Sequence, residues 1–287
     1  MIRIGSQSEA LLFLTTRIEA TTATNQASVG TGFFFDAPAD GGHIPLLITN
    51  KNVVTSSINT RLRLHLSLNP DVPPQPSGRS ITVDISTPKG SEWHHHPNGN
   101  VDLCALPIGS IMRRLEQEHN EKILYTSVGK QDAHSDTQLE QLMAIEDVIM
   151  VGYPSGLWDQ HNNLPIIRRG ITATHPAIDY NGKSEGVADI ACFPGSSGSP
   201  LFIFNEGPFG KKGGVMSMAT RAIFLGALYA GPFRKQDGEI QIREIPTSKV
   251  PVPVTSQMLH LGYYVKAKEV VALGEHIART VGRAGTP

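Results

Sequence analysis

The loop "FPGSSGSP", residues 193–200, carries the residues best suited to chemistry. Glycines on either side of a serine pair let the backbone turn sharply and leave peptide N–H groups pointing outward. The N–H groups of Gly195 and Ser197 are then placed to bind a developing oxyanion beside an attacking serine hydroxyl. An ordinary glycine-serine turn explains the same stretch about equally well.

A serine hydroxyl is a weak nucleophile unless a base removes its proton and an acid orients that base. The stretch "VDLCAL", residues 101–106, places one carboxylate, Asp102, among apolar residues at the start of a predicted strand. Burying a carboxylate without a partner is costly, so this position favours a paired acid. The alternative is an aspartate that caps a turn.

Three consecutive histidines, residues 94–96, form another cluster. In an extended segment neighbouring side chains point to opposite sides, so at most two of them could face one ion. No acidic or cysteine cluster nearby completes such a site. We therefore predict a loop packed under Trp93, with no metal and no other cofactor.

Short apolar or alternating runs closed by Gly, Pro, Asn or Asp predict the strands that would position these residues. In the first half the runs cover residues 11–18, 32–35, 44–49, 62–68, 81–85 and 101–106. In the second half they cover residues 148–152, 166–174, 187–192, 201–204, 215–219, 223–229 and 261–265. Six strands suit one closed barrel, so two barrels of similar size are expected.

Two helical segments complete this division. Charged sequence with helical spacing fills residues 111–146, and an amphipathic stripe ends the chain at Ala267, Val270, Val271, Gly274, Ile277, Ala278 and Val281. We predict an N-terminal barrel at residues 10–110, a connector at 111–146, a C-terminal barrel at 147–265 and a helix at 266–282. No internal repeat accompanies the two halves.

The composition excludes some classes of partner. With 25 basic and 26 acidic residues, the formal charge of −1 gives no field that favours nucleic acid or an anionic membrane.

The one apolar run near the N-terminus is too short for a signal peptide or a membrane span. Only Cys104 and Cys192 are present, which favours reduced thiols, and we expect a cytoplasmic protein.

Five ordered motifs resemble the trypsin-like serine peptidases of the chymotrypsin superfamily, specifically the bacterial intracellular type without disulfides. They are "GTGF" at residue 30, "TNKNVV" at 49, "VDLCAL" at 101, "VGYP" at 151 and "GSSGSP" at 195, across roughly residues 10–282. The resemblance implies an all-β fold of two six-stranded antiparallel β-barrels with a C-terminal α-helix. It also implies Ser197 as nucleophile, Asp102 as orienting acid, and Gly195 with Ser197 as the oxyanion hole.

The base position of that pattern falls on Asn52 instead of histidine. An amide does not take up a proton near neutral pH, so it cannot activate Ser197. It can imitate the hydrogen bonds of the imidazole, with its NH₂ donating towards Asp102 and its carbonyl facing the serine. Rescue by another histidine, such as His43, His65 or one of residues 94–96, is disfavoured because the family geometry places only position 52 beside both partners.

The resemblance also implies how substrate binds. The strand that ends in Tyr229, Ala230 and Gly231 would pair with an extended peptide. Ala191, six residues before the nucleophile, gives the specificity pocket a neutral floor that favours a small or apolar side chain. Two hypotheses remain: a serine endopeptidase inactivated at position 52, or a natural pseudoprotease that binds peptides as a scaffold. A peptide or protein substrate is expected in both, with room for a regulatory protein partner.

Overall fold

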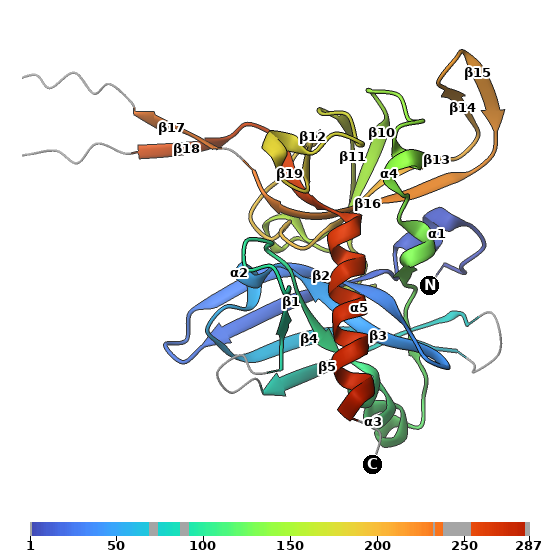
Figure 1. The fold of residues 1–287 in the computed structure, drawn as a ribbon. Coiled ribbons are helices and arrows are strands. Elements are labelled where there is room, and N and C mark those ends of the chain that lie inside the picture. The colour runs from blue at the N-terminus through green and yellow to red at the C-terminus, as the bar shows by residue number, and fades with distance from the viewer. Residues whose placement is uncertain (1, 69–73, 87–91, 232, 238–253, 285–287) are drawn as a thin grey trace, which may run out of the picture.

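The computed structural model describes residues 2–68, 74–86, 92–231, 233–237 and 254–284. Two β-structures follow one another along the chain, and a long helix at the C-terminus lies against both of them (Figure 1). The predicted all-β class with a C-terminal helix is therefore confirmed.

The N-terminal half is a sheet of nine strands. Six longer strands and the short β6 follow the order β5-β4-β1-β2-β3-β7-β6. Two further short strands lie off this path, where β8 pairs with β4 and β9 pairs with β2. The six longer strands match the six runs predicted from the sequence. Their bounds are β1 Thr15–Thr22, β2 Ala27–Ala39, β3 Gly42–Thr49, β4 Ser57–Ser67, β5 Pro76–Ser86 and β7 Cys104–Pro107, and the short ones are β6 His94–His95, β8 Ile123–Leu124 and β9 Val128–Gly129.

The start of the first strand differs from the prediction. Residues 7–11 form the helix α1 (Gln7–Leu11), and the strand begins only at Thr15. The cause is a capping box, in which the side chain of Ser6 accepts from the N–H of Glu9 while the Glu9 carboxylate accepts from the N–H of Ser6. The apolar run that begins at residue 10 therefore starts in a helix.

The segment between the two β-structures is only partly helical. Its helices are α3 Gly109–His119 and α4 Asp136–Leu139, with a 3₁₀ turn, η2, at Lys130–Asp132. Between these helices the strands β8 and β9 join the N-terminal sheet. Part of the predicted connector thus belongs to the first β-structure.

The C-terminal half contains a closed six-stranded barrel, as predicted, and its strands follow the order β10-β11-β12-β19-β16-β13. Its strands are β10 Asp147–Gly152, β11 Ile166–Thr172, β12 Glu185–Asp189, β13 Pro200–Asn205, β16 Arg221–Ala230 and β19 Leu261–Lys266. Two 3₁₀ turns, η3 Pro154–Gly156 and η4 Tyr180–Gly182, lie in its loops.

The strand predicted at residues 215–219 is not part of the barrel. It is β15 (Val215–Met218), which pairs only with β14 (Pro208–Lys211) in a hairpin that projects from the barrel (Figure 1). Val215, Met216 and Met218 are 59%, 66% and 80% exposed, so apolar content alone did not place this strand in the core. A second separate pair joins β17 (Phe233–Asp237) and β18 (Val254–Met258).

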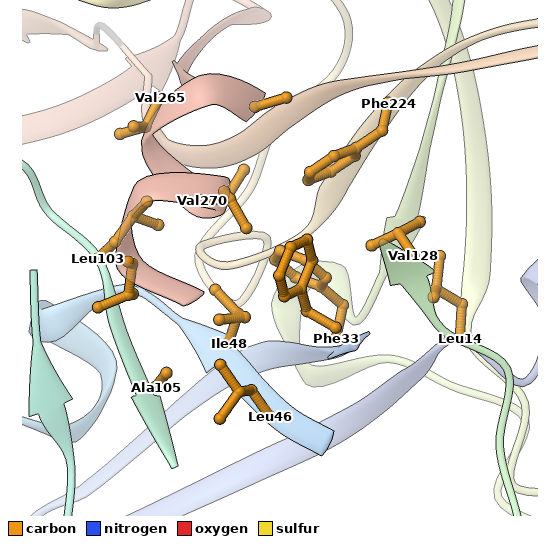
Figure 2. Close-up of a cluster of buried hydrophobic side chains, with 14 of the residues drawn as sticks. Leu14, Phe33, Leu46, Ile48, Leu103, Ala105, Val128, Phe224, Val265 and Val270 are labelled. Atoms are coloured by element: carbon orange, nitrogen blue, oxygen red, sulfur yellow. The ribbon is translucent and has the colours of Figure 1, made fainter. Parts of the chain in front are cut away.

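The helix α5 (Ala267–Ala284) packs where the two β-structures meet. Val270, Leu273 and Ile277 are fully buried in a cluster that also contains Phe33 and Phe224, one from each half (Figure 2). The predicted stripe is thus the buried face at residues 267, 270 and 277, whereas Val281 lies outside the residues whose side chains are described. No described helix is long and apolar enough to cross a membrane.

Candidate active site

The loop between β12 and β13 has the sharp turns that its glycines predicted. Gly195 and Gly198 have φ angles of +90° and +86°, in the left-handed region that side chains disfavour. A methyl group on Gly195 would lie 2.5 Å from the carbonyl oxygen of Tyr153, and one on Gly198 would lie 2.0 Å from that of Thr31. Both positions therefore require glycine for backbone conformation and for space.

The backbone N–H groups on either side of Ser196 have no acceptor among the described residues. The N–H of Ser196 donates to Phe193 O at 2.9 Å and that of Gly198 donates to Leu228 O at 2.8 Å. The N–H groups of Gly195 and Ser197 donate to none of the described residues. Backbone donors in folded proteins are nearly always paired, so the unpaired N–H groups of Gly195 and Ser197 are available to an external acceptor.

Thr31 of β2 holds this loop against the N-terminal sheet. Its N–H donates to Ser197 O at 2.9 Å, and its hydroxyl donates to Gly195 O at 3.0 Å. The same hydroxyl accepts from Ser199 Oγ at 3.1 Å and from the N–H of Tyr153 at 3.2 Å. One fully buried threonine thus fixes the loop at residues 195–199 between the two halves.

Asp102 lies two residues before β7, with its carboxylate at the start of the short helix α2 (Lys51–Val54). Its Oδ1 accepts from the N–H of Lys51 at 3.0 Å, and the N–H of Asn52 also donates to the carboxylate. Burial raises the pKa of Asp102 above its ordinary value, and these two N–H groups together with the Lys51 charge oppose that shift. The acid is therefore partnered, as its sequence position indicated.

The side chain of Asn50 holds the backbone of Asp102 in place. Its Nδ2 donates to the carbonyl oxygen of Asp102 at 2.6 Å, and its side chain is fully buried. Together with the contacts of α2, this bond joins the end of β3 to the loop that carries the acid. Position 52 and Asp102 are consequently brought together by backbone contacts.

The side chain of Asn52 does not make the hydrogen bonds that would imitate an imidazole. It is exposed and bonds to none of the described residues. Ser197 Oγ donates at 3.5 Å to the carbonyl oxygen of Tyr229, a long and weak bond. Among the described residues, the carbonyl oxygen of Tyr229 is thus the one acceptor of the Ser197 hydroxyl.

Two of the histidines weighed as replacement bases are engaged elsewhere. His65 Nε2 bonds to Asn163 O at 2.9 Å, and burial lowers its pKa to about 4. His96 Nδ1 accepts from the N–H of Asn98 at 3.1 Å, while its Nε2 lies 3.2 Å from a Glu269 carboxylate oxygen without hydrogen-bond geometry. Within the described residues, no group of three His, Cys, Asp or Glu side chains has the arrangement of a metal site.

The residues predicted to bind substrate lie around the same loop. Tyr229 meets Ser197 through its carbonyl oxygen, and Ala191 is half-buried at the start of the loop. Ala230 pairs through its backbone with Tyr263 of β19, although its side chain lies outside the described residues. Gly231 follows the end of β16 and is partly exposed.

Sequence reasoning did not identify the side chains that hold the site together. Thr31, Asn50 and Ser199 are buried polar residues whose partners lie up to 168 residues away in the chain. Burial of a polar side chain implies a partner, but the sequence does not say which one. Thr31 lies within the "GTGF" motif, which was the only signal that could have drawn attention to it.

No protein-family model matches the chain, and no curated protein matches it by sequence. Among solved structures, the thermostable serine protease AL20 from an extremophilic microorganism is 10% identical, with a TM-score of 0.48 over 94% of this chain and 99% of that one. The active form of the Rv3671c protease from M. tuberculosis is 14% identical, with a TM-score of 0.40 over 98% and 84%. The scabies mite inactivated protease paralogue S-I1 is 10% identical, with a TM-score of 0.41 over 96% of each chain.

Proposed function

We propose that the chain is a serine endopeptidase of the trypsin-like kind in which Asn52 occupies the place of the catalytic base. Ser197 is the nucleophile, Asp102 is the orienting acid, and the N–H groups of Gly195 and Ser197 form the oxyanion hole. As written, the chain binds peptides and cleaves them poorly.

The observation that carries this proposal is the pair of free N–H groups beside a serine hydroxyl. They belong to a loop whose two left-handed glycines could be replaced only by distorting it. Donors held ready for a charge that develops in the transition state are a large part of catalysis by acyl-transfer enzymes. A loop that served only as a turn would gain nothing from leaving these donors unpaired.

The proposed low activity follows from the residue at position 52. The N–H of this residue already donates to the Asp102 carboxylate, so a side chain at position 52 starts next to the acid. A histidine there is expected to reach both Asp102 and Ser197, whereas an amide cannot take the serine proton. Loss of a triad base lowers turnover by a factor on the order of 10⁶ in a model serine protease.

The second candidate function is a natural pseudoprotease that binds peptides without cleaving them. Asn52 is the observation that favours it, since its exposed side chain leaves Ser197 without a base. A peptide-binding groove and a protein partner are compatible with both candidates. The two differ in whether the remaining residues still catalyse once a base is supplied.

For substrate, we propose an extended peptide that pairs with the backbone at the end of β16, near Tyr229 and Gly231. Ala191 is half-buried and uncharged, which favours a small or apolar side chain of the substrate over lysine or arginine. Backbone pairing supplies affinity with little sequence selectivity.

Replacing Asn52 by His tests the proposal. Casein and a panel of peptides are incubated with the unchanged chain, with Asn52→His, and with the double variant Asn52→His/Ser197→Ala. We expect hydrolysis by Asn52→His alone, with peptides cut after small or apolar residues. If folded Asn52→His hydrolyses nothing, the peptidase assignment fails and the binding function takes its place.

A further inference from the structure

A cavity of about 200 Å³ lies between the N-terminal sheet and the loop that follows η3. β1 and β4 form one wall, and the loop at residues 158–163 forms the other. Three arginines and one tryptophan are prominent in its lining, which includes Arg17, Arg61, Arg63, Trp158, Glu19 and Asn163.

The positive charge in this cavity exceeds the negative charge beside it. Arg17 pairs with Glu19, and Arg61 pairs with Asp84 at 2.8 Å. Arg63 has only neutral acceptors among the described residues, Ser80 Oγ at 2.9 Å and Gln160 O at 3.3 Å. Its charge is therefore not matched by any described carboxylate.

Hydrogen-bond donors are also left over. A guanidinium has five N–H donors in one plane, and each of these arginines uses only part of them. The Nε of Arg17 is buried with no partner among the described residues. The Arg17 guanidinium lies 4.2 Å over the Trp158 ring, which fixes its plane but occupies none of its N–H groups. Several fixed donors and an unmatched charge are what an oxyanion needs.

The same cavity adjoins the turn that supports the oxyanion loop. Arg17 Nη2 lies 3.5 Å from where a side chain on Gly156 would begin. On the other side of that turn, the N–H of Ser155 donates to Pro194 O at 2.5 Å, next to Gly195. Arg17 and the oxyanion loop thus contact the same three-residue turn, η3.

We propose that this cavity binds a small oxyanion, either a phosphate or a carboxylate group, and that the bound anion steadies the η3 turn and through it the loop at residues 194–197. Arg63 supplies the unmatched charge, and Arg17 and Arg61 supply further donors. The binding itself is independent of the function proposed above, whereas the steadying of an oxyanion hole rests on it.

Binding is measured with inorganic phosphate and, in parallel, with citrate, at constant ionic strength held with chloride. Trp158 reports on the site because it lines the cavity, and the other tryptophan, Trp93, is buried in a separate cluster. We expect a saturable change in tryptophan emission and a Tm raised by ~3 °C at ten times the half-saturating anion. The anion with the lower half-saturating concentration shows whether the cavity prefers a phosphate or a carboxylate group.

Variants show whether the cavity is responsible. Trp158→Phe should lose the emission change and keep the Tm shift, while Arg63→Gln should weaken binding at least tenfold. Arg61→Gln provides a second test should Arg63→Gln fold poorly. The matched control is Arg114→Gln, which removes an exposed arginine on α3 that pairs with Glu118. The proposal would be overturned if the unchanged chain showed no saturable binding. It would also be overturned if folded Arg63→Gln and folded Arg61→Gln both bound the anion as tightly as the unchanged chain does.

Hydrogen exchange tests the link to the loop without requiring activity. Peptides that cover residues 153–158 and 193–199 are followed with and without saturating phosphate. We expect slower exchange in both segments for the unchanged chain and no change for Arg63→Gln. Unchanged exchange in the anion-bound protein would remove the steadying role.

Discussion

At the scale of single residues, the site depends on buried polar side chains that bond to distant parts of the chain. Thr31 is the clearest case, because its hydroxyl makes three hydrogen bonds and its N–H a fourth. Such a residue acts on the nucleophile only through position. It fixes Gly195 and Ser197 but contacts no reacting atom.

Replacing Thr31 by Val keeps the shape of the side chain and removes the hydroxyl. The Ser199 hydroxyl, the N–H of Tyr153 and the carbonyl of Gly195 would each lose a partner in a buried environment. We expect the free energy of unfolding to fall by about 2 to 4 kcal/mol. Urea denaturation measures it, and Thr31→Ser, which keeps the hydroxyl, should lose much less. Equal losses in the two variants would contradict this account.

His65 predicts a dependence of stability on pH. Burial lowers its pKa to about 4, below the ordinary 6.5, so the folded state holds the ring neutral while the unfolded state protonates it more readily. The stability it contributes is therefore complete above pH 6.5 and is lost as the pH falls towards 4. The shift corresponds to about 3 kcal/mol.

The measurement is the free energy of unfolding from pH 7.5 to pH 4 for the unchanged chain and for His65→Gln. The difference between the two curves isolates this histidine from the other titrating groups. We expect the unchanged chain to lose more stability than the variant over this range. Parallel curves would show that His65 does not titrate as its burial indicates.

At the scale of elements, the nucleophile loop is set by backbone conformation. Gly198 combines a φ of +86° with a side-chain position only 2.0 Å from Thr31 O. Gly213, in the exposed hairpin between β14 and β15, has nearly the same φ, +87°, with open space around it. Substituting Gly198 and Gly213 in turn therefore separates the cost of a left-handed φ from the cost of a steric clash with Thr31 O.

Gly213→Ala should reduce the free energy of unfolding by only about 1 to 2 kcal/mol, the cost of a left-handed alanine. Gly198→Ala adds a backbone collision and should cost about 3 kcal/mol or more, or displace the loop. Chemical denaturation measures both variants. Similar losses would mean that the loop at residue 198 is free to move away from β2.

The positions of most strands along the chain could be predicted from the sequence, but their boundaries and the exceptions could not. Alternating runs such as residues 62–68 mark a strand with one buried face, and β4 occupies that segment. The strand β15 is rich in apolar residues and remains exposed, because burial depends on partners distant in the chain. Helix α1 instead followed a local capping box, a signal present in the sequence but outweighed by the apolar run after it.

For the candidate site, the sequence indicated the paired Asp102 and the turning glycines correctly. It did not indicate that backbone N–H groups, and not the side chain of Asn52, would contact the acid. The difference has a physical cause: a carboxylate at the start of a short helix accepts from whichever N–H groups the helix leaves unpaired. Residue identity at position 52 has no influence on those bonds.

At the scale of the whole molecule, the site lies where the two β-structures meet, and one core joins them. Phe33 of the N-terminal sheet, Phe224 of the barrel and Leu273 of α5 are buried in the same cluster. Asp102, the proposed acid, is on one side of this junction and Ser197, the proposed nucleophile, is on the other. Their relative position is therefore fixed by the shared core and by Thr31, so that a base supplied at position 52 should meet a preformed site.

Covalent labelling tests this central claim most directly. The unchanged chain, Asn52→His and Asn52→His/Ser197→Ala are incubated with a fluorophosphonate, and intact masses are recorded over time. The account predicts one adduct per chain for Asn52→His, located on Ser197 by peptide mapping, and none on the other two within the same period. A correctly folded Asn52→His that remains unlabelled would contradict it.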